Sequence, residues 1–190
     1  ALLSSTALAS LLLPSCLSDA RQTPGISSPA AGKESPMISD NRNATARVAL
    51  VRTKNRKEGV LKALNLFGLN PVKGKKVMLK PNFNTADPLP ASTHNDTLST
   101  FITSLKDMGA TSITIAERSG PANTRDVLGQ KGILRLAEEL GFDIINLEEM
   151  KPEGWVHLTS QGGNWRNGFL FARPYLEAER IVTTCCLKTH

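Results

Sequence analysis

Polar residues of the kinds that bind anions or transfer protons occur in three groups, and each group follows an apolar run that predicts a β-strand. A lysine can neutralise a carboxylate or phosphate, and a histidine can move a proton because its pKa lies near neutrality. The first group is Lys80, Asn82 and, at the end of the same loop, His94; the second is Glu117 and Ser119; the third is Lys188 and His190.

We therefore expect a site for a small anionic, oxygen-rich molecule, and an enzyme that transfers a proton to or from it. Abstraction of a proton beside a carbonyl, as in a racemase or epimerase, needs two proton-transfer groups flanking one carbon. The predicted roles are substrate binding by Lys80, Asn82, Ser119 and Lys188, and catalysis by His94, Glu117 and His190.

Other interpretations of the same residues stay open. Lys80 can simply extend from a strand end into water, Asn82 suits a turn, and Glu117 with Arg118 can be a surface pair. The pocket could also belong to a lipid-anchored binding or redox-accessory protein whose iron–sulfur centre lies outside this chain. A divalent metal held by His94, Asp96 or His190 is a variant of the enzyme hypothesis.

The elements that must position these groups alternate along residues 47–190. Apolar runs predict strands at residues 48–51, 76–80, 112–116, 143–147 and 180–186, and a hairpin at 155–159 and 169–171. Helical spacing predicts helices at residues 60–67, 95–108 and 133–140, and a short one beginning near Thr124. This order predicts an α/β domain with a mostly parallel sheet and helices on both faces. The chain stops four residues after the last predicted strand, so we expect the sheet to be incomplete at the C-terminus.

Ligands of open α/β sheets bind beyond the carboxyl ends of the strands, which is where all three polar groups fall. Asn95 or Asp96 is expected to cap the helix at residues 95–108, and Thr124 is expected to cap the short helix that follows the next strand. Gly68 is expected to end the first helix.

The first sixteen residues are apolar and uncharged, and their length suits an export signal better than a membrane span. The tetrapeptide ending at Cys16 resembles a bacterial lipobox, so Cys16 is the expected lipidation site; ordinary cleaved secretion is the alternative. Residues 17–46 are rich in Ser, Pro and Ala and predict a flexible tether. We expect an exported protein, periplasmic or at the cell surface, attached to the membrane if Cys16 is lipidated.

Composition argues against several other classes. The net charge of the 190 residues is +6, but the basic residues are dispersed and aromatic residues make up only 5%, so nucleic-acid binding is not expected. Three cysteines cannot build an iron–sulfur centre or a disulfide scaffold. Cys185 and Cys186 are adjacent on a predicted strand, so they should point to opposite faces and not share a metal.

The motifs Lys80-Pro81-Asn82, Glu117-Arg118-Ser119-Gly120 and Leu187-Lys188-Thr189-His190, in this order and spacing, resemble the family known as domain of unknown function 362. The resemblance covers about residues 48–190 and implies that the chain holds the N-terminal part of that domain. Some members of the family carry ferredoxin-type clusters, for which this chain has no cysteines. The resemblance therefore implies a fold and a site, and it names no reaction.

Overall fold

The computed structural model describes residues 48–159 and 165–186. The expected export signal with Cys16, the tether at residues 17–46, and Lys188 and His190 lie outside the described residues. Within those residues, no helix is long and apolar enough to cross a membrane.

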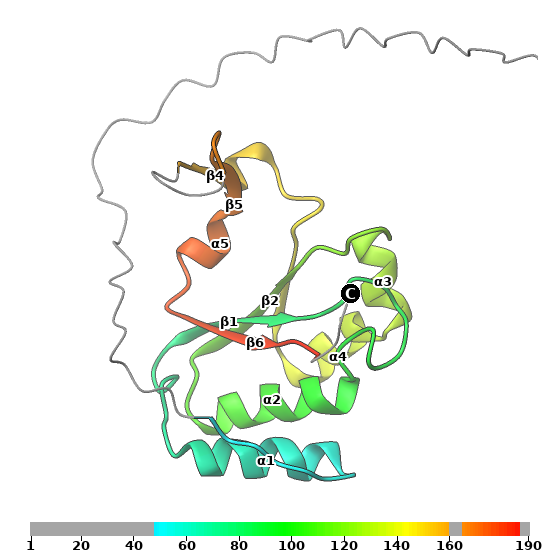
Figure 1. Cartoon of the computed structure of the whole chain (residues 1–190), viewed down its shortest axis with the longest axis vertical. Coiled ribbons are helices and arrows are strands. Elements are labelled where there is room, and N and C mark those ends of the chain that lie inside the picture. The colour runs from blue at the N-terminus through cyan, green and yellow to red at the C-terminus, as the bar shows by residue number, and fades with distance from the viewer. Residues whose placement is uncertain (1–47, 160–164, 187–190) are drawn as a thin grey trace, which may run out of the picture. The chain divides into compact units, whose positions relative to one another are not determined.

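The centre of the domain is a four-stranded sheet in the order β3-β2-β1-β6, and all of its strands are parallel (Figure 1). The strands are β1 (Lys76–Pro81), β2 (Ser112–Glu117), β3 (Asp143–Asn146) and β6 (Arg180–Thr184). Val77, Met78 and Leu79 of β1 are consecutive buried apolar residues because both faces of this central strand are covered. The predicted α/β class with a mostly parallel sheet flanked by helices is confirmed.

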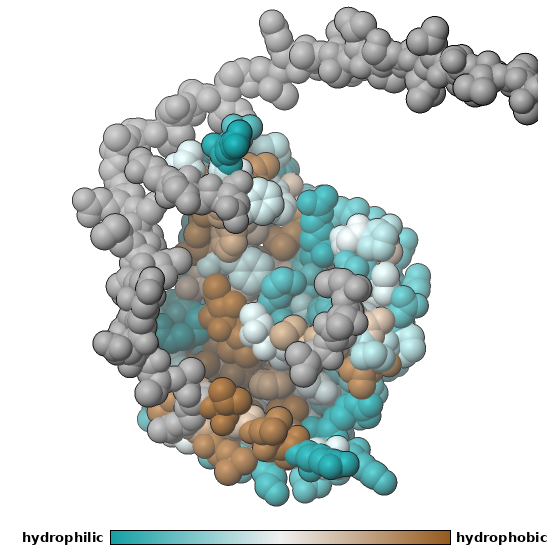
Figure 2. Space-filling model, in the orientation of Figure 1, coloured by the Kyte–Doolittle hydropathy of each residue, from teal (hydrophilic) through white to brown (hydrophobic). Residues whose placement is uncertain are grey.

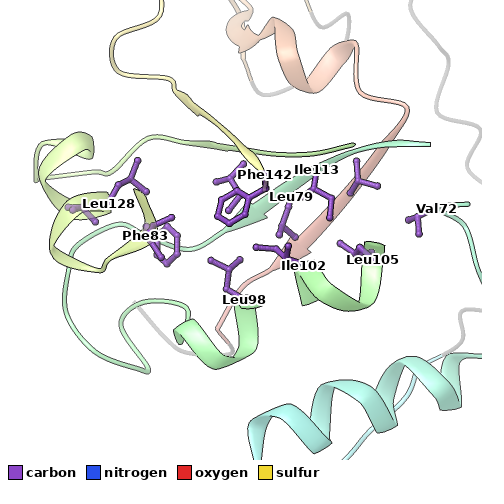
Figure 3. Packing of buried hydrophobic residues seen from close by; sticks show 13 residues of the cluster. Val72, Leu79, Phe83, Leu98, Ile102, Leu105, Ile113, Leu128 and Phe142 are labelled. Atoms are coloured by element: carbon purple, nitrogen blue, oxygen red, sulfur yellow. The ribbon is translucent and has the colours of Figure 1, made fainter. Parts of the chain in front are cut away.

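One face of the sheet packs against α2 (Asn95–Asp107), α3 (Thr124–Gln130) and α4 (Ile133–Leu140). Figure 3 shows how Leu98, Ile102 and Leu105 of α2 point toward Leu79 and Ile113 of the sheet. All five side chains are buried to 97% or more, so this layer is the main core. α1 (Arg56–Phe67) packs on α2 as an outer layer, and Gly68 ends it with a φ of 64°.

The opposite face carries smaller elements. They are the 3-10 turn η1 (Pro152–Gly154), the antiparallel hairpin of β4 (Trp155–Leu158) and β5 (Phe169–Ala172), and the single-turn helix α5 (Arg173–Leu176). A second, smaller cluster of Met78, Ala116, Leu147 and Ala172 joins them to the sheet. The predicted hairpin is therefore confirmed, and Figure 1 shows it on the side of the sheet away from α1 and α2.

The predicted helix caps are wrong by one residue. His94 caps α2, because its Nδ1 accepts a hydrogen bond from the Asp96 N–H at 3.1 Å. Asn123 caps α3 through the Asp126 N–H, while the Thr124 side chain accepts a bond from Ser119 N–H instead. Each cap is the residue whose side chain reaches a free N–H of the first turn, and spacing alone does not select it.

The predicted strand at residues 48–51 is also wrong. This segment has no strand pairing, and Val48 and Leu50 are 84% and 91% exposed. A four-residue apolar run is consistent with a buried strand but does not require one, because a strand forms only where a neighbouring strand can hydrogen-bond to the segment.

The last strand is shorter than predicted, ending at Thr184 rather than at residue 186. Among the described strands β6 pairs only with β1, and Thr184 is the partner of Pro81, where β1 ends. A proline has no N–H to continue a ladder, so β6 loses its partner there and both cysteines fall beyond the sheet.

Candidate functional site

The polar groups that follow the strands meet at one edge of the sheet, because parallel strands place their carboxyl ends on the same side. Lys80 of β1 and Thr183 of β6 are partners in the ladder, so their side chains leave the same face. A groove of about 480 Å³ begins there. Its lining residues are Lys80, Pro81, Asn82, Asn84, Thr183, Cys185 and Cys186.

Glu117 ends β2 next to this groove and is only 3% exposed. Its Oε1 accepts hydrogen bonds from the Lys80 ammonium at 3.2 Å and from the Arg118 N–H at 3.0 Å. Its Oε2 is buried and forms no hydrogen bond of regular length and angle with any described residue, although the Phe83 N–H gives the carboxylate a weaker stabilisation. Arg118 is exposed, and the ion-pair partner of Glu117 is the Lys80 ammonium rather than the Arg118 guanidinium.

Burial dominates the electrostatics of this carboxyl group. Removal from water raises the pKa of Glu117, and the Lys80 charge, the Arg118 N–H and the nearby Phe83 N–H oppose that rise without cancelling it. A raised pKa makes this carboxylate a stronger base than an ordinary glutamate, which suits proton transfer.

Tyr175 closes the sheet face beside Glu117. Its hydroxyl donates to the carbonyl oxygen of Ala116, and its ring belongs to the smaller core cluster. Burial, followed by the Glu117 charge, raises the pKa of this phenol beyond the range in which it would ionise. Tyr175 therefore remains neutral, and it places an uncharged aromatic side chain beside Glu117.

The loop after β1 is held by hydrogen bonds within itself and by one to the end of β6. The Asn82 N–H donates to the Thr93 hydroxyl at 2.9 Å, and that hydroxyl donates to the Thr184 carbonyl at 2.7 Å. The Asn82 side-chain amide donates to the Ala91 carbonyl at 3.1 Å. These bonds hold Asn82 on the wall of the groove, where the sequence predicted a binding residue.

Ser119 is buried between the exits of β1 and β2. Its hydroxyl donates to the Phe83 carbonyl at 2.7 Å, and its N–H donates to Thr124. The following residue, Gly120, has no side chain to keep Asn84 away: a Cβ there would lie 2.3 Å from Asn84 Oδ1. The Ser119-Gly120 pair thus joins two strand exits and lets Asn84 reach the groove.

The structure brings Lys80, Asn82 and Glu117 together at one edge, and Ser119, two residues after Glu117, is bonded to Phe83 of the loop after β1. His94 is separate from the groove lining, and its ring forms the cap of α2. Lys188 and His190 lie outside the described residues. Sequence reasoning missed Asn84 and Thr183. Asn84 could have been found, because it is a second asparagine two residues after Asn82. Thr183 could not, because its place beside Lys80 depends on the pairing register of β6 with β1.

The described residues do not provide a complete set of ligands for the divalent metal that the sequence suggested at His94, Asp96 or His190. His94 Nδ1 lies 3.8 Å from Asp96 Oδ2, but no group of three or more His, Cys, Asp or Glu side chains in the described ranges could hold a metal ion. His190, the third predicted ligand, is not among those residues.

Comparison with known proteins gives one match. No curated protein and no solved structure matches the chain. A family model described as "Domain of unknown function (DUF362)" matches residues 77–190, beginning inside β1 and including every candidate site residue named above. Because this match covers more than half of the sequence and contains the whole carboxyl edge of the sheet, the chain belongs to the DUF362 family.

Proposed function

We propose that this protein is an enzyme that transfers a proton to or from a small anionic, oxygen-rich substrate held at the carboxyl edge of the sheet. One observation carries the proposal: Glu117 is almost fully buried, and it shares the groove-lining Lys80 while its second oxygen has no hydrogen bond of regular length and angle among the described residues. A buried polar atom without a partner is costly unless another group, such as a ligand, completes it.

Substrate binding and basicity would be coupled through Lys80. A carboxylate or phosphate in the groove would compete with Glu117 for the Lys80 ammonium, which is 46% exposed and therefore accessible. Glu117 would then lose part of the charge that holds its pKa down, and it would become a stronger base at the moment when the substrate is bound. Abstraction of a proton from the carbon beside the substrate's anionic group is the reaction class that this coupling favours.

A racemase or epimerase needs a second proton-transfer group on the other side of that carbon. Lys188 and His190 follow Cys186, a residue of the groove wall, by two and four positions. We keep Lys188 as a second anion-binding group and His190 as the second proton-transfer group in this proposal. His94 remains a candidate only through the ring nitrogen that is not used by the α2 cap.

Solvent exchange tests the proposal directly. The full chain is incubated in D₂O with a panel of chiral 2-hydroxy acids and amino acids, and NMR follows deuterium entering at the carbon beside the carboxylate. We expect exchange with at least one member, its loss in Glu117→Gln, and retained binding of the same compound by that variant. Binding without exchange by the unaltered protein would show that the groove is a recognition site, as in the accessory-protein alternative.

We also propose that the protein is exported and lipidated at Cys16. The support is the apolar, uncharged segment that ends in Leu13-Pro14-Ser15-Cys16. Metabolic labelling with a clickable palmitate analogue should mark the unaltered chain and leave Cys16→Ser unlabelled. Labelling of neither, with release of a processed chain, would instead support cleaved secretion.

A further inference from the structure

Two thiols share the wall of the groove. Because β6 ends at Thr184, Cys185 and Cys186 are not held on opposite faces of a sheet, and both line the same cavity as Lys80 and Asn82. Cys185 is exposed, Cys186 is partly exposed, and both are free thiols. The prediction that they lie on a strand and point to its opposite faces is therefore wrong.

Cationic groups flank this thiol pair. Lys80 lines the same groove. Lys131 lies near Cys186, with its ammonium 5.4 Å from the centroid of the Phe83 ring. Burial lowers the pKa of Lys131, and Cys186 and Asp87 counteract that effect by favouring its charged form. These two ammonium groups would attract an anionic disulfide toward the thiols.

We propose that Cys185 and Cys186 form a thiol–disulfide exchange site whose substrate is a small anionic disulfide. This inference uses the wall of the groove and does not depend on proton transfer by Glu117. It assigns the groove a two-electron chemistry that the proposed function does not include.

The reaction balances without any further reactant. The thiolate of one cysteine attacks a sulfur of the small disulfide, a mixed disulfide forms, and one thiol leaves with the proton released by that cysteine. The second thiolate then attacks the protein sulfur of the mixed disulfide, which closes the Cys185–Cys186 bond and releases the second thiol with the second proton. Overall the two protein thiols are oxidised, and one disulfide is reduced to two thiols.

Because the two cysteines are adjacent, a disulfide between Cys185 and Cys186 would be easy to reduce. Neighbouring Cα atoms are about 3.8 Å apart, which is shorter than the roughly 4.4–6.8 Å that unstrained disulfides span. Strained, exposed disulfides are more readily reduced than structural ones, which is the property of catalytic and regulatory pairs. Charge decides the substrate, because Lys80 and Lys131 attract an anion and repel a cation.

The experiment uses the reduced full chain carrying Cys16→Ser, so that the two thiols are the only ones present. Oxidised glutathione is the anionic probe and cystamine is the cationic one, and intact-mass spectrometry follows both reactions. We expect oxidised glutathione to yield a chain lighter by two hydrogens, with a disulfide-linked peptide that contains both cysteines. Cys185→Ser and Cys186→Ser should each stop at a stable glutathione adduct.

The rate comparison tests the charge argument. Oxidised glutathione should react about tenfold faster than cystamine at low salt, and Lys131→Met should reduce that preference several-fold. Lys57→Met, an exposed lysine on α1, is the matched control and should leave it unchanged. A stable adduct on the chain with both thiols, or equal rates for the two probes, would overturn the inference. Thermal unfolding of each variant shows whether a lost reaction reflects lost structure.

Discussion

At the scale of single residues, the site depends on one buried carboxyl group and one partly exposed ammonium. Glu117 and Lys80 come from neighbouring strands and meet at 3.2 Å, but their exposures differ, at 3% and 46%. The exposed partner can leave the pair for a substrate anion, whereas the buried partner cannot leave for water. This asymmetry makes the pair suitable for binding-coupled proton transfer rather than for stability alone.

The pH dependence of stability should report the ionisation of Glu117. Because its pKa is higher in the folded protein than in the unfolded chain, protonated Glu117 favours folding, and that advantage is present at low pH. It is lost as the pH rises through the raised pKa. Thermal melts from pH 4 to 8 should therefore show Glu117→Gln gaining stability relative to the unaltered protein as the pH increases. A constant difference across this range would contradict a raised pKa.

Lys80→Met should affect both ligand binding and folding. Loss of a charge-assisted hydrogen bond costs about 1.5–3 kcal/mol, so affinity for the exchanging carboxylate should fall about ten- to a hundredfold by calorimetry. Glu117 also loses its cation, so the variant should be less stable at pH 8 than at pH 5. The double variant Lys80→Met/Glu117→Gln should recover stability at pH 8. An additive double-mutant cycle would mean that the two side chains do not interact in solution.

At the scale of elements, the loop between β1 and α2 places candidate site residues and structural residues in one segment. It begins with Asn82 on the groove wall and ends with His94 capping α2, and Thr93 ties it to the end of β6. The same strand-to-helix geometry recurs after β2, where Ser119 and Asn123 connect to α3. The groove wall is thus formed by the start of the β1–α2 loop together with the end of β6 and the residues after it.

Two substitutions can distinguish a capping role of His94 from a proton-transfer role. His94→Ala removes the cap of α2 and should lower the free energy of unfolding by about 1 kcal/mol, while His94→Asn restores a good cap and should unfold near the unaltered midpoint. If His94 acts mainly as a cap, His94→Asn also keeps its deuterium-exchange rate. A large loss of exchange in a stable His94→Asn variant would instead show that the ring transfers a proton.

At the scale of the whole domain, the two faces of the sheet are covered unequally. Three helices bury the face that contains Leu79 and Ile115, whereas among the described residues the opposite face carries only the hairpin, η1 and the single-turn helix α5. Large apolar side chains stay exposed there and along the edge strand, among them Leu170, Leu176 and Ile181 at 64%, 47% and 50%. Figure 2 shows brown, hydrophobic surface between the hairpin and α1.

Exposed apolar surface of this kind promotes self-association. Ile181→Lys should lower the tendency to associate in a concentration series measured by light scattering, and it should change stability by only about 0.5 kcal/mol because the side chain is half exposed. Leu66→Lys, at a comparably exposed position of α1, is the control and should associate like the unaltered chain. Equal behaviour of both variants would show that the β6 region does not drive association.

Local pattern determined the order and type of most elements. The apolar runs at Val77 and Ile113 and the helical spacing through Leu98 and Ile102 each match an element of the structure, because burial requires those periodicities wherever the segment packs. The clustering of Lys80, Asn82 and Glu117 also followed from sequence, since parallel strands must end on one edge.

Tertiary structure alone decided the features on which the proposed chemistry depends. Glu117 is buried because β2 lies between β1 and β3 and Tyr175 packs nearby, which no spacing rule contains. Cys185 and Cys186 share a groove because β1 ends at Pro81, so β6 has no strand to pair with beyond Thr184. Residues 48–51 have the composition of a strand but no partner edge. Periodicity is a property of one segment, whereas burial, register and pairing belong to the segments that surround it.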